Sequence, residues 1–188
     1  MIIKRKWAMP NAKTFTVKPI KKLIERYYNP ELVCINPFAN ESKYGITNDL
    51  NPRFNCDYNL EATEFLELFE PKTVDLVLYD PPYTPHQLKH MYEDITGGVN
   101  LLDTKNSYWS KQKDMIRDMV KNNGIVISCG YDSNGIGKTR GFEIIEILLV
   151  AHGGGHNDTI VTVERKLNQT TLMDYNNKKW GGINNHRD

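Results

Sequence analysis

The chain has 188 residues, of which 39% are hydrophobic and 25% charged, and its formal net charge is +1. These values are typical of a globular domain and exclude a protein whose overall charge alone would attract nucleic acid, so any such surface has to be local. Three widely spaced cysteines, the lack of an apolar run of about 18 residues and a basic start over 1–6 predict a cytoplasmic protein without disulfides, membrane span or secretory signal.

The first half of the chain alternates expected helices and strands, after a basic and irregular segment over 1–18. Apolar residues recur at helical spacing after Pro19, and short apolar runs between turn residues are typical of buried strands. In chain order we expect a helix over 20–28, short strands at 32–35 and 45–49, a weak strand candidate at 54–56, an amphipathic helix over 61–69 and a strand at 74–79.

The second half begins with a polar stretch that shows no clear periodicity. After it we expect a helix over 109–120 and strands at 124–129, 142–150 and 159–163, the last two joined by a glycine-rich turn. Alternating strands and helices predict an α/β fold with a mostly parallel sheet, and the final pair predicts an antiparallel last strand. We expect one domain over 1–166, with 84–113 as a possible substrate-binding insertion and 167–188 as a loose tail.

Polar residues follow several of these strands. They are Asn36 to Asn40 after the first, Asp49 after the second, Asp57 after the weak candidate and Asp80 to Tyr83 after the fourth. In open α/β sheets, ligands bind outside the carboxyl ends of the strands. Asp49 could accept hydrogen bonds from the hydroxyls of a cofactor ribose, although an aspartate beside Asn51 and Pro52 is more often a turn residue.

The tetrapeptide Asp80-Pro81-Pro82-Tyr83 is the most informative motif. An exocyclic base amine is a poor nucleophile because its lone pair is delocalised into the ring. Rigid acceptors for its two hydrogens would favour methylation, and the carboxylate and a proline-segment carbonyl can supply them, since proline has no N–H and a fixed φ. Tyr83 could stack on a base that has left its duplex.

This tetrapeptide, after an apolar strand, resembles the catalytic motif of amino-group methyltransferases, above all the DNA adenine-N6 family. Asn36-Pro37-Phe38-Ala39 resembles the cofactor loop of that family. The segment from Phe15 and Thr16 to Ile20 resembles the part of the family that packs against the methionine end of the cofactor. The resemblance covers residues 11–166. It implies the class I methyltransferase (Rossmann-like) three-layer fold, with a seven-stranded sheet whose last strand is antiparallel, and it implies S-adenosyl-L-methionine as cofactor.

The same resemblance implies roles for individual residues. Asp49 and its neighbour Leu50 match the ribose-binding position, and Asp57 roughly matches the acid near the adenine amine of the cofactor. Asp80, Pro81, Pro82 and Tyr83 would be catalytic, with Asp80 also beside the cofactor. No metal is required. The loop after the first strand lacks the family's usual glycines and starts with Asn36 instead of an acid.

No separate target-recognition domain is expected. Basic and aromatic residues within or beside 84–113 could bind a nucleic-acid backbone and stack on a base, among them Tyr83, Lys89, Tyr108, Trp109 and Lys111. Acidic residues dilute this segment, so a solvated loop fits its composition equally well.

Three functions remain open from the sequence. The first is methylation of adenine N6 in DNA. The second is the same chemistry on RNA or on a protein amide, although aspartate in the first motif position favours adenine. The third is a non-enzymatic binding or scaffold protein that keeps the fold, which the glycine-poor loop supports. The sequence leaves the oligomeric state open.

Overall fold

A computed structural model of the chain describes residues 1–83 and 107–168. The polar stretch 84–106, with Lys89, and the end of the expected tail, 169–188, lie outside the described residues. Among those described, no helix is long and apolar enough to cross a membrane.

Seven strands form one sheet with the order β1-β6-β7-β5-β4-β2-β3. Their bounds are β1 Ile2–Trp7, β2 Cys34–Asn36, β3 Ile46–Thr47, β4 Val74–Tyr79, β5 Val120–Gly130, β6 Phe142–Ala151 and β7 Thr159–Lys166. Strand β7 runs antiparallel to both β5 and β6, and every other pair is parallel. The mostly parallel seven-stranded sheet with an antiparallel last strand is therefore confirmed.

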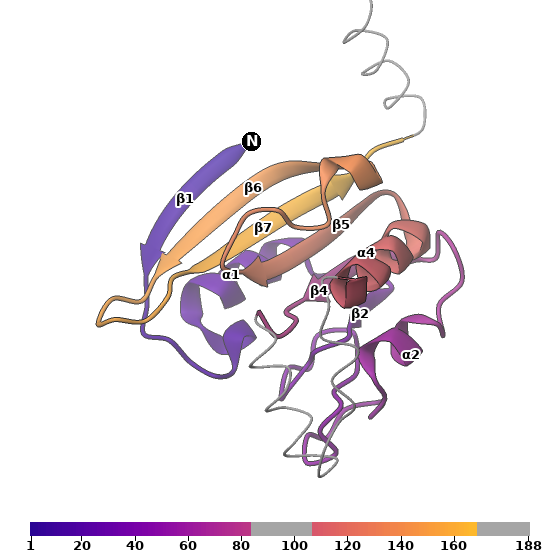
Figure 1. The fold of residues 1–188 in the computed structure, drawn as a ribbon, viewed down its shortest axis with the longest axis horizontal. Helices are drawn as coiled ribbons and strands as arrows, with labels where there is room; N and C mark the ends of the chain where they lie inside the picture. Colours follow the sequence, from indigo (N-terminus) through magenta and orange to yellow (C-terminus); the bar gives the residue numbers. More distant parts are fainter. Residues whose placement is uncertain (84–106, 169–188) are drawn as a thin grey trace, which may run out of the picture.

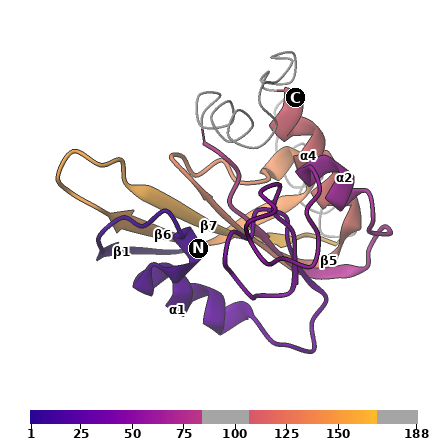
Figure 2. The same cartoon turned by 90° about the horizontal axis from the view of Figure 1, so that it is seen from below.

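Helices cover both faces of the sheet, which gives three layers (Figures 1 and 2). Helix α1 (Lys18–Tyr27) lies on one face, whereas α2 (Ala62–Leu66) and α4 (Ser107–Met119) lie on the other. Two short 3₁₀ turns complete the elements, η1 (Thr14–Thr16) and η3 (Lys138–Arg140).

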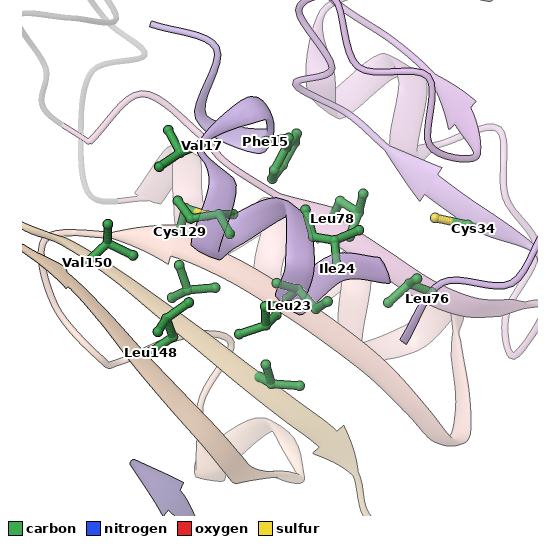
Figure 3. Packing of buried hydrophobic residues seen from close by; sticks show 14 residues of the cluster. Phe15, Val17, Leu23, Ile24, Cys34, Leu76, Leu78, Cys129, Leu148 and Val150 are labelled. Carbon is green, nitrogen blue, oxygen red and sulfur yellow. The ribbon is translucent and has the colours of Figure 1, made fainter. Parts of the chain in front are cut away.

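Each face of the sheet has its own apolar core. On the α1 side, Ile20, Leu23 and Ile24 recur at helical spacing and pack on Leu76 and Leu78 of β4 (Figure 3). On the α4 side, the alternate β4 residues Val77 and Tyr79 pack with Ile116. Because β4 is buried on both faces, its sequence is a nearly continuous apolar run.

Two expectations about strands were wrong. Residues 2–7 are not irregular but form β1, which pairs with β6 at the edge of the sheet. All six of its side chains are exposed, so no burial pattern marks the strand. The candidate at 54–56 forms no strand, because the amides of Phe54 and Cys56 bond within a local turn. Only an isolated bridge between Asn48 and Tyr58 continues the sheet there.

Candidate functional site

The carboxyl ends of the parallel strands β2, β3, β4 and β5 meet along one edge of the sheet, and a cavity of about 620 Å³ lies there. We call it the first cavity. Its walls come from segments far apart in the sequence, namely 10–17, 38–42 and 80–83, with Asp49, Tyr131, His152, His156, Asn157 and Thr159. Phe15, Thr16, Phe38, Ala39, Asp49 and Asp80, all expected at a cofactor site, are brought together in it.

The loop after β2 is held in place by polar contacts to the end of β3. The Asn48 side chain donates to the carbonyl oxygens of Pro37 and Leu60, at 3.1 and 3.0 Å. The amide of Ala39 donates to the carbonyl of Asn48 at 2.8 Å. At the point where the family would have glycines, Asn40 adopts a left-handed φ of 51°. Asparagine tolerates this conformation better than most residues, so the loop closes without glycine.

Asp49 closes the base of this loop and faces the first cavity. One carboxylate oxygen accepts from the amide of Asn40 at 2.8 Å, and the other accepts from the amide of Asn51 at 2.9 Å. Burial raises the pKa of Asp49, and these two backbone hydrogen bonds oppose the rise. Each carboxylate oxygen retains a further lone pair with which a ligand hydroxyl could bond.

The segment between β1 and α1 forms the opposite wall. Phe15, in η1, is buried in the α1-side core and lines the cavity. Across the cavity, Lys13 forms an ion pair with Glu41 at 2.5 Å. Both side chains are about half exposed, so this pair contributes little to stability. It does connect the two segments that border the cavity.

Asp80 lies where β4 ends, because Pro81 and Pro82 cannot continue the hydrogen bonding of a strand. Its Oδ1 accepts a hydrogen bond from the Tyr83 hydroxyl. Burial raises the pKa of Asp80, and hydrogen bonds from the side chains of Tyr83 and Thr14 oppose the rise. The carboxyl is therefore held as an acceptor at the wall of the first cavity.

A second cavity, of about 410 Å³, lies against the same tetrapeptide. Both cavities are lined by Pro81, Pro82 and Tyr83, and by Tyr131 after β5. The rings of Tyr83 and Tyr131 meet edge-on, with their centroids 4.7 Å apart. The remaining walls are Tyr79, Trp109, Ser110, Lys113, the segment 128–130, Asp132, Gly135 and Arg140. The end of β4 thus stands between two spaces.

Several expected site residues lie elsewhere. Asp57 was expected near the cofactor, but it is exposed, lines neither cavity and accepts from the amide and hydroxyl of Thr47, both at 2.8 Å. Lys111 lines neither cavity and forms an ion pair with Glu67 at 3.3 Å. Asn36 is fully buried beneath the loop, and its side-chain N and O have no hydrogen-bond partner within the described residues.

Three others meet beside the first cavity. Pro37, Leu50 and Tyr108 line a small hollow together with Asp49. The hydroxyl of Tyr108 donates to Glu61 there. Trp109, the next residue of α4, lies instead in the wall of the second cavity.

Sequence reasoning missed two residues that shape the site, Asn48 and Tyr131. It included Asn40 in the polar loop after the first strand and Lys113 in the basic and aromatic set of 84–113, without a role for either residue by itself. The adjacent pair Asn48 and Asp49 at a strand end was a usable signal for Asn48, since both types bond to backbone groups. Tyr131 gave no signal, because only the sheet brings the end of β5 to the tetrapeptide.

Comparison with known proteins identifies the fold. No family model matches the sequence, and no curated protein is similar to it. Among solved structures, TrmN from Thermus thermophilus superposes with a TM-score of 0.51 at 17% identity, over 80% of this chain and 49% of that protein, so the chain spans about half its length.

Two further structures cover more of their own length. A 1,6-didemethyltoxoflavin-N1-methyltransferase from Burkholderia thailandensis, with 1,6-didemethyltoxoflavin and S-adenosylhomocysteine bound, has a TM-score of 0.53 at 11% identity, over 80% of this chain and 78% of its own. A SAM-dependent methyltransferase from Methanosarcina mazei has a TM-score of 0.53 at 9% identity, over 77% and 97%. With the observed strand order, these similarities show that the chain has the class I methyltransferase fold.

Proposed function

We propose that this chain is an S-adenosyl-L-methionine-dependent methyltransferase that transfers a methyl group to N6 of adenine in DNA. One observation carries the proposal. Pro81, Pro82 and Tyr83 line both cavities, and Asp80, directly before them, lines the first. A transferase needs this arrangement, because donor and acceptor must meet from opposite sides of the reacting atom.

The residues of the first cavity fit the cofactor. Asp49 offers carboxylate lone pairs to ribose hydroxyls, and Asn40 Oδ1 is a buried acceptor without a partner within the described residues. Phe15 and Phe38 add apolar surface to the same walls. S-adenosylmethionine would supply an electrophilic methyl group here. The Burkholderia enzyme of similar fold carries S-adenosylhomocysteine, which supports this assignment.

The chain's own contribution is to hold the amine. The Tyr83 hydroxyl donates a hydrogen bond to Asp80. An entering amine would take that acceptor with one hydrogen, and a carbonyl of the proline segment would accept the other. Both acceptors are fixed, which favours a tetrahedral nitrogen whose lone pair is free to react. The raised pKa of Asp80 also equips it to take the proton that the methylated amine releases.

The motif favours adenine over a protein amide, because the tetrapeptide begins with aspartate. We propose DNA as the polymer because the motif resembles that of the DNA adenine-N6 family. Trp109 and Tyr131 give the second cavity aromatic surface for a base that has left its stack.

The test is Asp80→Ala, compared with Glu31→Ala as a surface control that removes an acid far from either cavity. DNA and RNA are incubated with labelled S-adenosylmethionine, digested, and the modified nucleoside identified. We expect Asp80→Ala to abolish formation of N6-methyl-2′-deoxyadenosine in DNA while calorimetry shows unchanged binding of S-adenosylhomocysteine. Wild-type turnover in Asp80→Ala would refute the mechanism.

The same experiment separates the alternatives. Label in RNA alone would replace DNA as the substrate. A parallel incubation with protein in place of nucleic acid tests the amide, and label recovered in a methylated amide would replace the base. A wild-type chain that binds no S-adenosylhomocysteine at high concentration would be a scaffold that keeps the fold. Each alternative gives a different labelled product or a different binding titration, so the outcomes can be told apart.

A further inference from the structure

The second cavity has a lysine, Lys113, that forms no ion pair within the described residues. It lies on α4, lines the cavity and is about half-buried. Within residues 1–83 and 107–168, its ammonium makes no hydrogen bond or ion pair. Burial lowers the pKa of Lys113, since desolvation disfavours the charged form.

The carboxylates of Asp132 and Glu164 raise the pKa of Lys113 through their charge, but each of them accepts hydrogen bonds from backbone amides. The Asp132 carboxylate accepts from the amide of Asn134 at 2.8 Å. Buried Glu164 accepts from the amides of Ile136 and Gly137, at 2.6 and 2.9 Å.

Arg140 is also committed to the protein. It donates to Asp114 at 2.9 Å and to the Ser110 hydroxyl at 2.8 Å, which fixes the loop after β5 against α4. An anionic ligand in the cavity would therefore meet Lys113 as the uncommitted cation, with Arg140 adding positive charge nearby.

The polar groups of the cavity also point to a ligand. Ser128 lines it, and its buried hydroxyl has no partner within the described residues. On the same face of the sheet, Gln112 accepts from the Tyr79 hydroxyl at 2.9 Å, while its own amide nitrogen is buried and unpartnered. Buried polar groups are normally satisfied. A ligand that bonds to Ser128 would explain one of these exceptions.

We propose that Lys113 forms a phosphate subsite in the second cavity and binds the phosphate next to the target nucleotide. The proposal rests on the proposed function and names the contact that makes its substrate a nucleotide. The second cavity, of about 410 Å³, holds groups that match one nucleotide. The cation matches the phosphate, and the aromatic surface of Trp109 and the hydrogen-bonding groups match the base. A protein amide substrate would leave the ammonium unpaired.

The test uses Lys113→Met, which keeps the length of the side chain and removes its charge. Lys22→Met, on exposed α1, is the matched control for total charge. With a DNA oligonucleotide, we expect Lys113→Met to raise KM about tenfold at low salt with little change in kcat. The slope of log affinity against log salt should fall by about 0.9, the loss of one phosphate contact. Lys113→Arg should restore most of the affinity.

A chemical change in the DNA isolates the contact. Replacing the phosphate beside the target deoxyadenosine with a neutral methylphosphonate should weaken wild-type binding as much as Lys113→Met does. The variant should then lose nothing further on the modified DNA. Equal losses from the methylphosphonate in wild type and Lys113→Met would overturn the subsite, as would an unchanged KM.

The outcomes for this subsite and for the proposed function are distinct. If wild type methylates DNA but Lys113→Met behaves like Lys22→Met, the subsite alone is refuted. If wild type methylates no nucleic acid and binds none in an anisotropy titration, both proposals fail. The melting temperature of each variant shows whether a loss comes from unfolding.

Discussion

At the scale of single residues, the hydrogen bond from the Tyr83 hydroxyl to Asp80 affects the pH range in which Asp80 can act as an acceptor. Burial raises the pKa of the carboxyl, and the Tyr83 hydroxyl opposes that rise. An amine needs the ionised form, so activity is retained above the folded-state pKa and lost as pH falls through it.

We therefore expect Tyr83→Phe to move the acid limb of kcat/KM to higher pH. Without the hydroxyl, the carboxylate loses a hydrogen bond that stabilises its charged form, and its pKa rises further. Tyr131→Phe is the control, because Tyr131 contacts Tyr83 only through its ring. The measurement is the normalised pH–rate profile. An acid limb that stays in place, or moves to lower pH, would show that Asp80 is not the titrating group.

Asn40 decides whether the cofactor loop keeps its shape without glycine. Its left-handed φ of 51° would cost an ordinary residue about 1–2 kcal/mol. We expect Asn40→Ala to lower the free energy of unfolding by about 1 kcal/mol, and Asn40→Gly to lower it less because glycine tolerates this φ. Urea unfolding measures both. Equal losses in the two variants would indicate that the conformation is not what Asn40 supplies.

The motif at Asp80 was predictable from the sequence, whereas the role of Asn40 was not. An apolar run that ends in two prolines fixes where β4 stops. Asparagine adopts right- and left-handed conformations in many turns. The φ of Asn40 can therefore be inferred only when the contacts of Asn48 and Asp49 are known. The same reasoning explains Asp57, which matched a family position by sequence but bonds to Thr47.

At the scale of elements, buried strands could be predicted from the sequence and an exposed strand could not. β4 was predicted with its observed bounds, because both faces are covered and its residues are nearly all apolar. β1 was missed because an edge strand with six exposed side chains needs no apolar alternation. The helix expected over 61–69 ends at Leu66, since Leu68 and Phe69 continue it only as tight turns.

The loop after β5 depends on Gly135 at its contact with β7. Gly135 has a φ of +54°, and a Cβ there would lie 2.2 Å from a carboxylate oxygen of Glu164. We expect Gly135→Ala to destabilise the fold by about 1–3 kcal/mol and to weaken oligonucleotide binding, because this loop walls the second cavity.

Gly130→Ala is the control for stability. A Cβ at Gly130 would meet its nearest atom at 3.7 Å, which is ordinary contact. Thermal unfolding compares the two variants. A Gly135→Ala protein as stable as Gly130→Ala would mean that Glu164 can move aside, and the loop would then not be fixed by this contact.

At the scale of the whole molecule, parallel strands bring both cavities to one edge of the sheet. The first cavity takes its walls from the segment before α1, the loop after β2 and the end of β4. The second takes them from α4 and the loop after β5. The order of elements along the chain predicted this edge, but periodicity carries no information on which loops face each other across it. The second cavity was therefore not predictable.

Among the described residues, the two cavities have Pro81, Pro82, Tyr83 and Tyr131 in common, so ligand binding to each should be separable by mutation elsewhere in their walls. S-adenosylhomocysteine at about 100 times its Kd should stabilise wild type by about 2.7 kcal/mol, which raises Tm by roughly 5–10 °C for a chain of this size. We expect Asp49→Asn to lose most of this rise and Lys113→Met to keep it.

The reverse pattern should hold for DNA. With an oligonucleotide, Asp49→Asn should bind as wild type does, and Lys113→Met should bind about tenfold more weakly. Each Tm is compared with that of the same ligand-free variant, which removes any effect of the substitution on folding itself. Loss of the Tm rise in Lys113→Met, or loss of DNA binding in Asp49→Asn, would show that the two cavities form one site. The segment from Asp80 to Tyr83 would then not be a boundary between methyl donor and acceptor.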